Sequence, residues 1–107
     1  IATDETELPY ERPPLSKDYL AGDKPFERLL IRPAGFWEER EVAMLRGRRI
    51  VEIDAAAHTA CDEGGAIIQY GSMIWAAGGV ARRLTCSGAD LVNVHTIRCR
   101  TDVDALK

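Results

Sequence analysis

Four side chains that can carry catalytic chemistry stand close together in the segment EIDAAAHTACDE, namely Asp54, His58, Cys61 and Glu63. A histidine oriented by an acid can act as a general base. A thiol that precedes a helix N-terminus is favoured as its reactive thiolate. The acids also have a simpler interpretation, because Asp and Glu commonly cap the start of a helix. No motif fixes catalytic roles, so the pattern leaves enzyme activity open and leans against it.

Histidine and cysteine also occur together in two places that bear on metal binding. The pairs are His58 with Cys61 and His95 with Cys99, and two His with two Cys are a ligand set that zinc accepts. On a strand, however, His95 and Cys99 would lie about 13 Å apart, at about 3.3 Å per residue. The chain also has no Cys-x-x-Cys pair. We therefore expect no metal site, and no motif indicates a cofactor.

The composition is that of a single globular domain. The chain has 107 residues, of which 46% are hydrophobic and 29% charged, and its net charge is −3. This charge provides no basic field, so nucleic acid is not an expected partner. The three cysteines are an odd number, which fits free thiols in a reducing compartment better than a set of disulfides. We therefore expect a cytoplasmic protein.

Arginines gather at a few points along the chain. They are Arg46, Arg48, Arg49, Arg82, Arg83, Arg98 and Arg100. Brought together, they would form a patch able to bind phosphate or nucleic acid. Glutamates and aspartates interleave with the first group, which favours a solvated and salt-bridged surface instead.

The run GGAIIQYGSMIWAAGGVA, from Gly64 to Ala81, contains no charged residue but five glycines. At about 100° per residue, its large apolar side chains gather on one side of a helix and its small residues on the other. Acids at Asp62 and Glu63 suit the start of such a helix. The run therefore predicts one long buried helix. The face with the large side chains would pack on a sheet, and the face with the small residues would pack against a second surface.

Three alternatives to that helix remain. The glycines can break it, which would leave a helix only over about residues 66–77. The small side can pack on the N-terminal part of the same chain. The run also touches the lower length limit for a membrane span, although Gln69, Ser72 and the glycines disfavour insertion.

The other elements are expected to be strands and an arm. The segments 26–32 and 91–100 have the apolar, β-branched character of strands, and residues 40–54 are predicted to form a hairpin turning at Arg46-Gly47. Prolines and acids predict that residues 1–25 form an extended arm, with a disordered tail as the alternative. The predicted fold is α+β: about four antiparallel strands on one long buried helix, with a single domain over residues 26–107.

These features together favour a small non-enzymatic subunit that self-associates or docks in a larger complex. The expected partner is a second copy of the chain or another protein, and a membrane is not expected. The expected interface comprises Gly64, Ile68, Gly71, Ser72, Trp75, Gly78 and Gly79 of the helix, with Tyr10 and Leu15 of the arm. The alternative is a small enzyme or ligand-binding domain with a pocket near His58 and Cys61.

Overall fold

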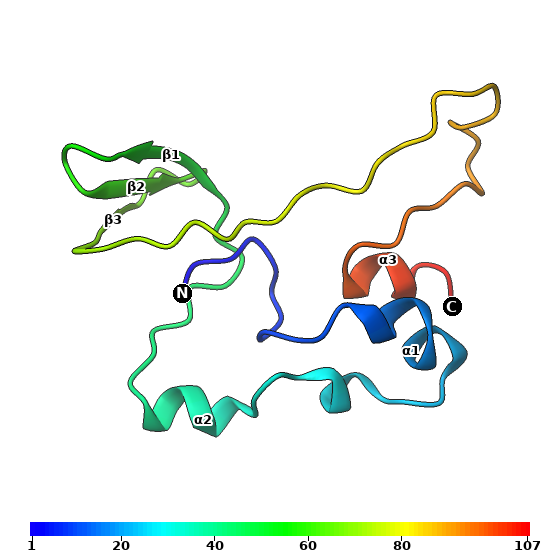
Figure 1. Ribbon diagram of the computed structural model, residues 1–107, viewed down its shortest axis with the longest axis horizontal. Helices are drawn as coiled ribbons and strands as arrows, with labels where there is room; N and C mark the ends of the chain where they lie inside the picture. Colours follow the sequence, from blue (N-terminus) through cyan, green and yellow to red (C-terminus); the bar gives the residue numbers. More distant parts are fainter. The chain divides into compact units, whose positions relative to one another are not determined.

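A computed structural model describes all residues of the chain, 1–107 (Figure 1). The elements in chain order are the 3-10 helix η1 (Pro13–Ser16), α1 (Asp18–Ala21), the 3-10 helix η2 (Phe26–Leu29), α2 (Ala34–Glu39), β1 (Ile50–Asp54), β2 (Thr59–Asp62), β3 (Ile67–Gln69) and α3 (Arg100–Asp104). The chain forms two compact units. The sheet unit comprises Ile1–Leu8 with Arg32–Ala77, and the helical unit comprises Pro9–Ile31 with Gly78–Lys107.

The sheet unit is built on three antiparallel strands in the order β1-β2-β3. Ile53 pairs with Ala60, which in turn pairs with Ile68, so these three side chains share one face. A bulge interrupts the β1–β2 register between Ile50 and Glu52. The β-branched residues of β1 favour this extended conformation.

The N-terminal residues of the sheet unit form a second, separate pairing. Ala2 pairs with Leu45 in a parallel bridge. The Leu45 N–H donates to the Ile1 carbonyl at 2.8 Å, and the Thr3 N–H donates to the Leu45 carbonyl at 3.0 Å. Alternate residues of this short extended segment, Ile1 and Thr3, therefore bond through their backbone to Leu45.

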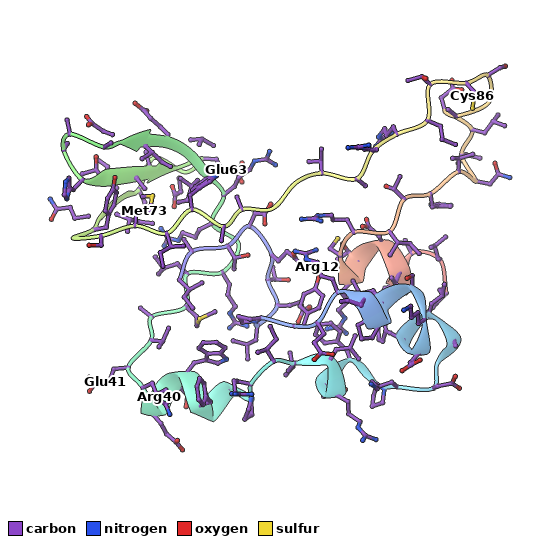
Figure 2. All side chains as sticks on the ribbon, viewed as in Figure 1. Arg12, Arg40, Glu41, Glu63, Met73 and Cys86 are labelled. Carbon is purple, nitrogen blue, oxygen red and sulfur yellow. The ribbon has the colours of Figure 1, made fainter.

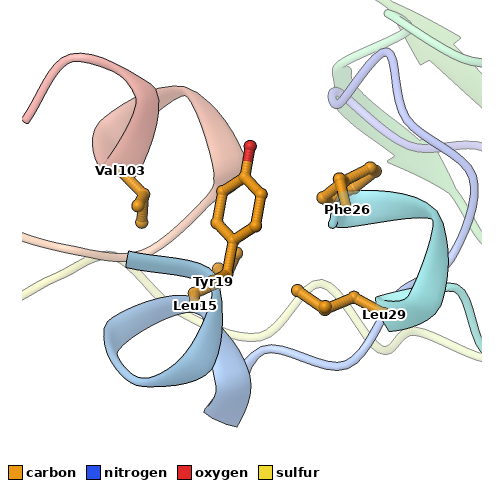
Figure 3. Packing of buried hydrophobic residues seen from close by; sticks show 5 residues of the cluster. All are labelled: Leu15, Tyr19, Phe26, Leu29 and Val103. Carbon is orange, nitrogen blue, oxygen red and sulfur yellow. The ribbon is translucent and has the colours of Figure 1, made fainter. Parts of the chain in front are cut away.

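The helical unit has its own core, composed of Leu15, Tyr19, Phe26, Leu29 and Val103 (Figure 3). Leu15, Leu29 and Val103 are at most 1% exposed. The Tyr19 and Phe26 rings meet edge to face, with their centroids 5.8 Å apart. The core thus joins η1, α1 and η2 to α3, which lies far away in the sequence.

The predicted long helix is absent, and this is the main correction to the sequence analysis. Within the run 64–81, only Ile67–Gln69 is regular, and it is a strand. Figure 2 labels Met73 and Cys86, and the ribbon between them has neither helix nor strand. Gly65 and Gly78 take φ values of +83° and +67°, a left-handed conformation that glycine adopts without strain and that interrupts a right-handed helix. The glycines therefore break the segment.

The predicted α+β class is confirmed in its coarse form, but the number of strands is wrong. Three strands are present where about four were expected. Residues 26–29 form η2, and residues 91–99 contain no strand. β1 pairs with β2, which follows it, and not with residues 40–45. The sequence Arg46-Gly47 predicts a turn, but it does not determine which segment pairs with β1. Strand pairing depends on packing with other residues, and here the partner is β2.

The division of the chain into an arm over residues 1–25 and a domain over residues 26–107 stays a prediction. The first 25 residues contain η1 and α1, and Leu15 and Tyr19 within them are buried.

Candidate functional site

The four residues with predicted catalytic chemistry lie around the β1–β2 hairpin. Asp54 ends β1, and its Oδ1 accepts from the N–H groups of Ala56 and Ala57 at 2.9 and 2.8 Å. This is the local turn bond that aspartate commonly makes. Asp54 therefore shapes the hairpin turn, and no hydrogen bond joins its carboxylate to His58.

His58 and Cys61 have separate surroundings. The His58 ring stacks on Tyr70, with centroids 5.5 Å apart and planes 11° from parallel. The Cys61 thiol donates to the carbonyl of Asp62 at 3.4 Å. No hydrogen bond joins any two of the four predicted residues, and Glu63 is exposed. Their catalytic role stays a prediction.

The carboxylate of Asp62 bonds to two backbone N–H groups and to an arginine. The sequence analysis assigned Asp62 only to a helix start. It is 5% exposed. Its Oδ1 accepts from the N–H groups of Gly64 and Ala66 at 3.0 and 2.8 Å, and its Oδ2 pairs with Arg48 at 3.0 Å. The hydrogen bond from Ala66 is the main cause that holds the pKa of Asp62 below its ordinary value, with Arg48 contributing. The ionised carboxylate thus organises the β2–β3 turn.

The helical unit holds a second cluster of charged and aromatic groups. The Tyr19 hydroxyl donates to Asp104 Oδ1 at 2.5 Å, and Arg100 Nε donates to Asp104 Oδ2 at 3.1 Å. The Arg100 guanidinium also lies 4.2 Å from the centroid of Phe26. The bond from Tyr19 lowers the pKa of Asp104, and the same bond raises the pKa of Tyr19. This cluster joins α3 to the core residues Tyr19 and Phe26.

Each unit also has a surface hollow. The hollow of the sheet unit, about 280 Å³, is lined by Leu8, Ala34, Trp37, Glu38, Val42, Met44 and Arg46. The hollow of the helical unit, about 320 Å³, is lined by Arg82, Arg83, Leu84, Ala89, Val94, His95, Thr96, Thr101, Asp102 and Ala105. Neither hollow includes His58 or Cys61, near which the sequence analysis placed a pocket.

The predicted interface residues are distributed over both units. In the sheet unit, Ile68 is half-buried in β3 and Trp75 is 59% exposed, while Gly64, Gly71 and Ser72 are exposed in irregular backbone. In the helical unit, Gly78 and Gly79 are exposed, Leu15 is in the core, and Tyr10 packs against that core. The interface role of these residues stays a prediction, but the helix face that was to present them is not formed.

No group of three or more His, Cys, Asp or Glu side chains is placed to hold a metal ion. All three cysteines are free thiols. No helix is long and apolar enough to cross a membrane.

The whole chain, residues 1–107, matches the family of pyridine nucleotide-disulphide oxidoreductases. The chain belongs to this family. It is 49% identical, over 99% of its length, to the ferredoxin reductase subunit of the 5,5'-dehydrodivanillate O-demethylase of Sphingobium sp. (strain NBRC 103272 / SYK-6). It is 52% identical, over 95% of its length, to the ferredoxin–NAD(P)(+) reductase of Sphingomonas sp.

Solved structures agree with these relatives. The ferredoxin reductase for the CYP199A2 system of Rhodopseudomonas palustris superposes with a TM-score of 0.85, at 33% identity over 96% of this chain and 25% of that one. The reductase of a covalent putidaredoxin reductase–putidaredoxin complex gives a TM-score of 0.83 over 96% of this chain and 25% of that one. The chain also spans only 26% and 25% of the Sphingobium and Sphingomonas relatives. It therefore corresponds to about a quarter of each.

These relationships correct the expected function. A non-enzymatic assembly subunit is wrong, because the family and the named relatives are oxidoreductases. The description of the chain as a structural subunit of unknown function is wrong for the same reason. The alternative, an enzyme, agrees better, although nothing places its chemistry near His58 and Cys61. One solved relative is bound to putidaredoxin; self-association of this chain is not shown.

The relatives' names imply a nicotinamide nucleotide, and the residues of this chain do not fit one. Dinucleotides bind where a strand runs through a glycine-rich turn into a helix, whose N-terminus faces the phosphates. The pairs Gly64-Gly65 and Gly78-Gly79 are not followed by a helix, and the longest helix, α2, has six residues. We therefore assign no step of hydride transfer to the residues of this chain.

Proposed function

We propose that this chain is part of a reductase that oxidises NAD(P)H and passes the electrons to a ferredoxin-type carrier protein. The observation that carries the proposal is the near-half identity, over almost the whole chain, to two ferredoxin reductases. The protein partner in this proposal is the carrier. Self-association and a cytoplasmic location stay predictions of the sequence.

We propose that the chain serves this reductase as scaffold, through surfaces that the rest of the protein covers. The first surface is the segment 71–85, which makes no backbone–backbone hydrogen bond. Ile74 is 93% exposed and Val80 is 90% exposed within it. Residues 71–81 of this segment carry no charge, and an uncharged apolar stretch is typical of a strand buried inside a sheet. The free backbone groups of such a strand need partners when water is excluded.

The second surface is the outer edge of the N-terminal extended segment. Ile1, Thr3 and Glu5 bond toward residues 45–48, whereas Ala2 and Asp4 make no backbone–backbone hydrogen bond. Such an edge accepts a further strand. Five of the expected interface residues lie in the first surface and are retained in this proposal: Gly71, Ser72, Trp75, Gly78 and Gly79. The occupant is the remainder of the reductase in place of a second subunit.

A chimera tests the function directly. Residues 1–107 replace the matching quarter of the Sphingomonas ferredoxin–NAD(P)(+) reductase, and NAD(P)H-dependent reduction of its ferredoxin is measured. We expect the chimera to retain activity. The matched control replaces residues 71–85 of the graft with a Gly/Ser sequence of equal length, which should abolish folding. A chimera that folds with an unchanged thermal midpoint but reduces no ferredoxin would refute the proposal.

A further inference from the structure

The sheet unit contains a buried hydrogen-bond donor without a partner, the indole N–H of Trp37 in α2. Its Nε1 is shielded from water and makes no hydrogen bond within the chain. The rings of Phe36 and Trp37 meet edge to face, with their centroids 5.2 Å apart, and an aromatic ring is at best a weak acceptor. Folded proteins leave very few buried donors unpaired, because such a group loses the bond that water gives it in the unfolded chain. The partner of this N–H is therefore expected from outside the 107 residues.

Trp37 lines the hollow of the sheet unit, which has a volume of about 280 Å³. Leu8, Val42 and Met44 line it too, and all four side chains are half-buried. Ala60 is the only buried apolar residue of this unit, so none of its large apolar side chains is covered on all sides. A folded domain covers such side chains with a second layer of structure. A cavity of about 150 Å³ already accepts a benzene-sized group, so the hollow has room for a large apolar side chain.

The charges at the edge of the hollow balance each other. Glu38 and Arg46 both line it and are exposed, and the Arg46 guanidinium donates to the Thr6 carbonyl at 3.1 Å. One cation and one anion give no net charge that would select an ionic ligand. The hollow therefore suits a neutral, apolar group that brings a hydrogen-bond acceptor.

We infer that a segment of the remaining reductase fills this hollow, with an apolar side chain against Leu8 and Met44 and an amide or carbonyl oxygen that accepts from Trp37 Nε1. The inference rests on the proposed function, in which the chain is about a quarter of the reductase, as it is of its relatives. The rest of the protein supplies the segment. Met44 has a flexible side chain, and its movement opens Nε1 to the incoming oxygen. None of the residues that line the hollow belongs to the segment 71–85, so this contact is a separate one.

Nuclear Overhauser contacts of the Trp37 indole proton test the inference in the chimera of residues 1–107 with the Sphingomonas reductase. The chimera is labelled isotopically at tryptophan, and Trp37→Phe identifies the signal by its loss. We expect cross-peaks from this proton to residues of the host reductase. Cross-peaks only to residues of the graft would overturn the inference.

A substitution that fills the hollow from within gives a second test. Ala34 lines the hollow, whereas Glu39 is an exposed residue of the same helix outside it. Ala34→Trp should lower the thermal midpoint of the chimera by about 3 °C or more relative to Glu39→Trp, because the new ring competes with the incoming segment and overpacking is destabilising. An equal or higher midpoint for Ala34→Trp would mean that no segment occupies the hollow. If Ala34→Trp does not fold, the Overhauser contacts of the unsubstituted chimera still decide.

Ferredoxin reduction by the chimera separates this inference from the proposed function. An active chimera whose Trp37 proton contacts only the graft refutes the contact and leaves the reductase proposal standing. A chimera with contacts to the host but no NAD(P)H-dependent reduction of ferredoxin refutes the reductase proposal and leaves the contact standing.

Discussion

At the scale of single residues, Asp62 is the group whose ionisation the fold depends on most directly. The N–H of Ala66 and Arg48 lower the pKa of Asp62 in the folded chain. As pH falls toward the ordinary aspartate pKa of about 3.9, the unfolded chain therefore binds more protons than the folded chain. The stabilisation is therefore present above that pH and is lost as pH falls through the folded pKa. We expect Asp62→Asn to flatten the acid side of the stability profile in urea unfolding. Asp90→Asn, at an exposed side chain that makes no hydrogen bond or ion pair, should leave the profile unchanged. An identical response of both variants would contradict the assignment.

The Tyr19 hydroxyl is a second residue whose role can be measured. It is bonded to the Asp104 carboxylate at 2.5 Å, within a ring that is 6% exposed. Tyr19→Phe should lower the free energy of unfolding by about 1.5 to 3 kcal/mol, as for a hydrogen bond to a charged group. Tyr70→Phe removes only a bond of 3.4 Å at an exposed site and should cost less. Equal losses in thermal unfolding would show that the Asp104 bond does not hold α3.

At the scale of elements, the segment 71–85 makes the clearest prediction. Trp75 is 59% exposed, although its neighbours are apolar and uncharged. In a Trp37→Phe background, its fluorescence should be red-shifted and open to acrylamide quenching in the isolated chain. In the chimera the emission should shift to the blue and quenching should fall, because the rest of the reductase covers the segment. A tryptophan equally quenched in both proteins would contradict the proposed burial.

The same segment shows what sequence reasoning could and could not supply. The β-branched residues of β1 and the α+β class were predictable from local pattern. The helix predicted over 64–81 was not correct. Small residues gather on one side only if the backbone is helical, and glycines at positive φ prevent that. An acid before an uncharged run is suited both to a helix start and to a turn. The sequence therefore did not distinguish a helix start at Asp62 from the turn at Gly64 and Ala66. The long-range contacts of Val103 and Tyr10 carry no local signal.

At the scale of the whole molecule, the chain divides into two compact units. The five-residue core lies in the helical unit, and the stabilities of the two units should be separable. Leu29→Ala in the helical unit should lower the free energy of unfolding by about 2 to 5 kcal/mol, which is the usual effect for a buried leucine. Because the buried core contains only five residues, this loss should melt the helical unit while amide signals of β1–β3 persist. Ile74→Ala, at a site 93% exposed, should have little effect. Simultaneous loss of both sets of NMR signals would contradict independent unfolding of the two units.

The assignment to a reductase is tested most directly by counting electrons through the chimera. A hydride from NAD(P)H carries two electrons, whereas a ferredoxin with a single one-electron cluster takes one at a time. We therefore expect about two ferredoxins reduced for each NAD(P)H oxidised, with no ferredoxin reduced when the nucleotide is omitted. A well-folded chimera that oxidises no NAD(P)H, or that oxidises it without reducing ferredoxin, would contradict the account.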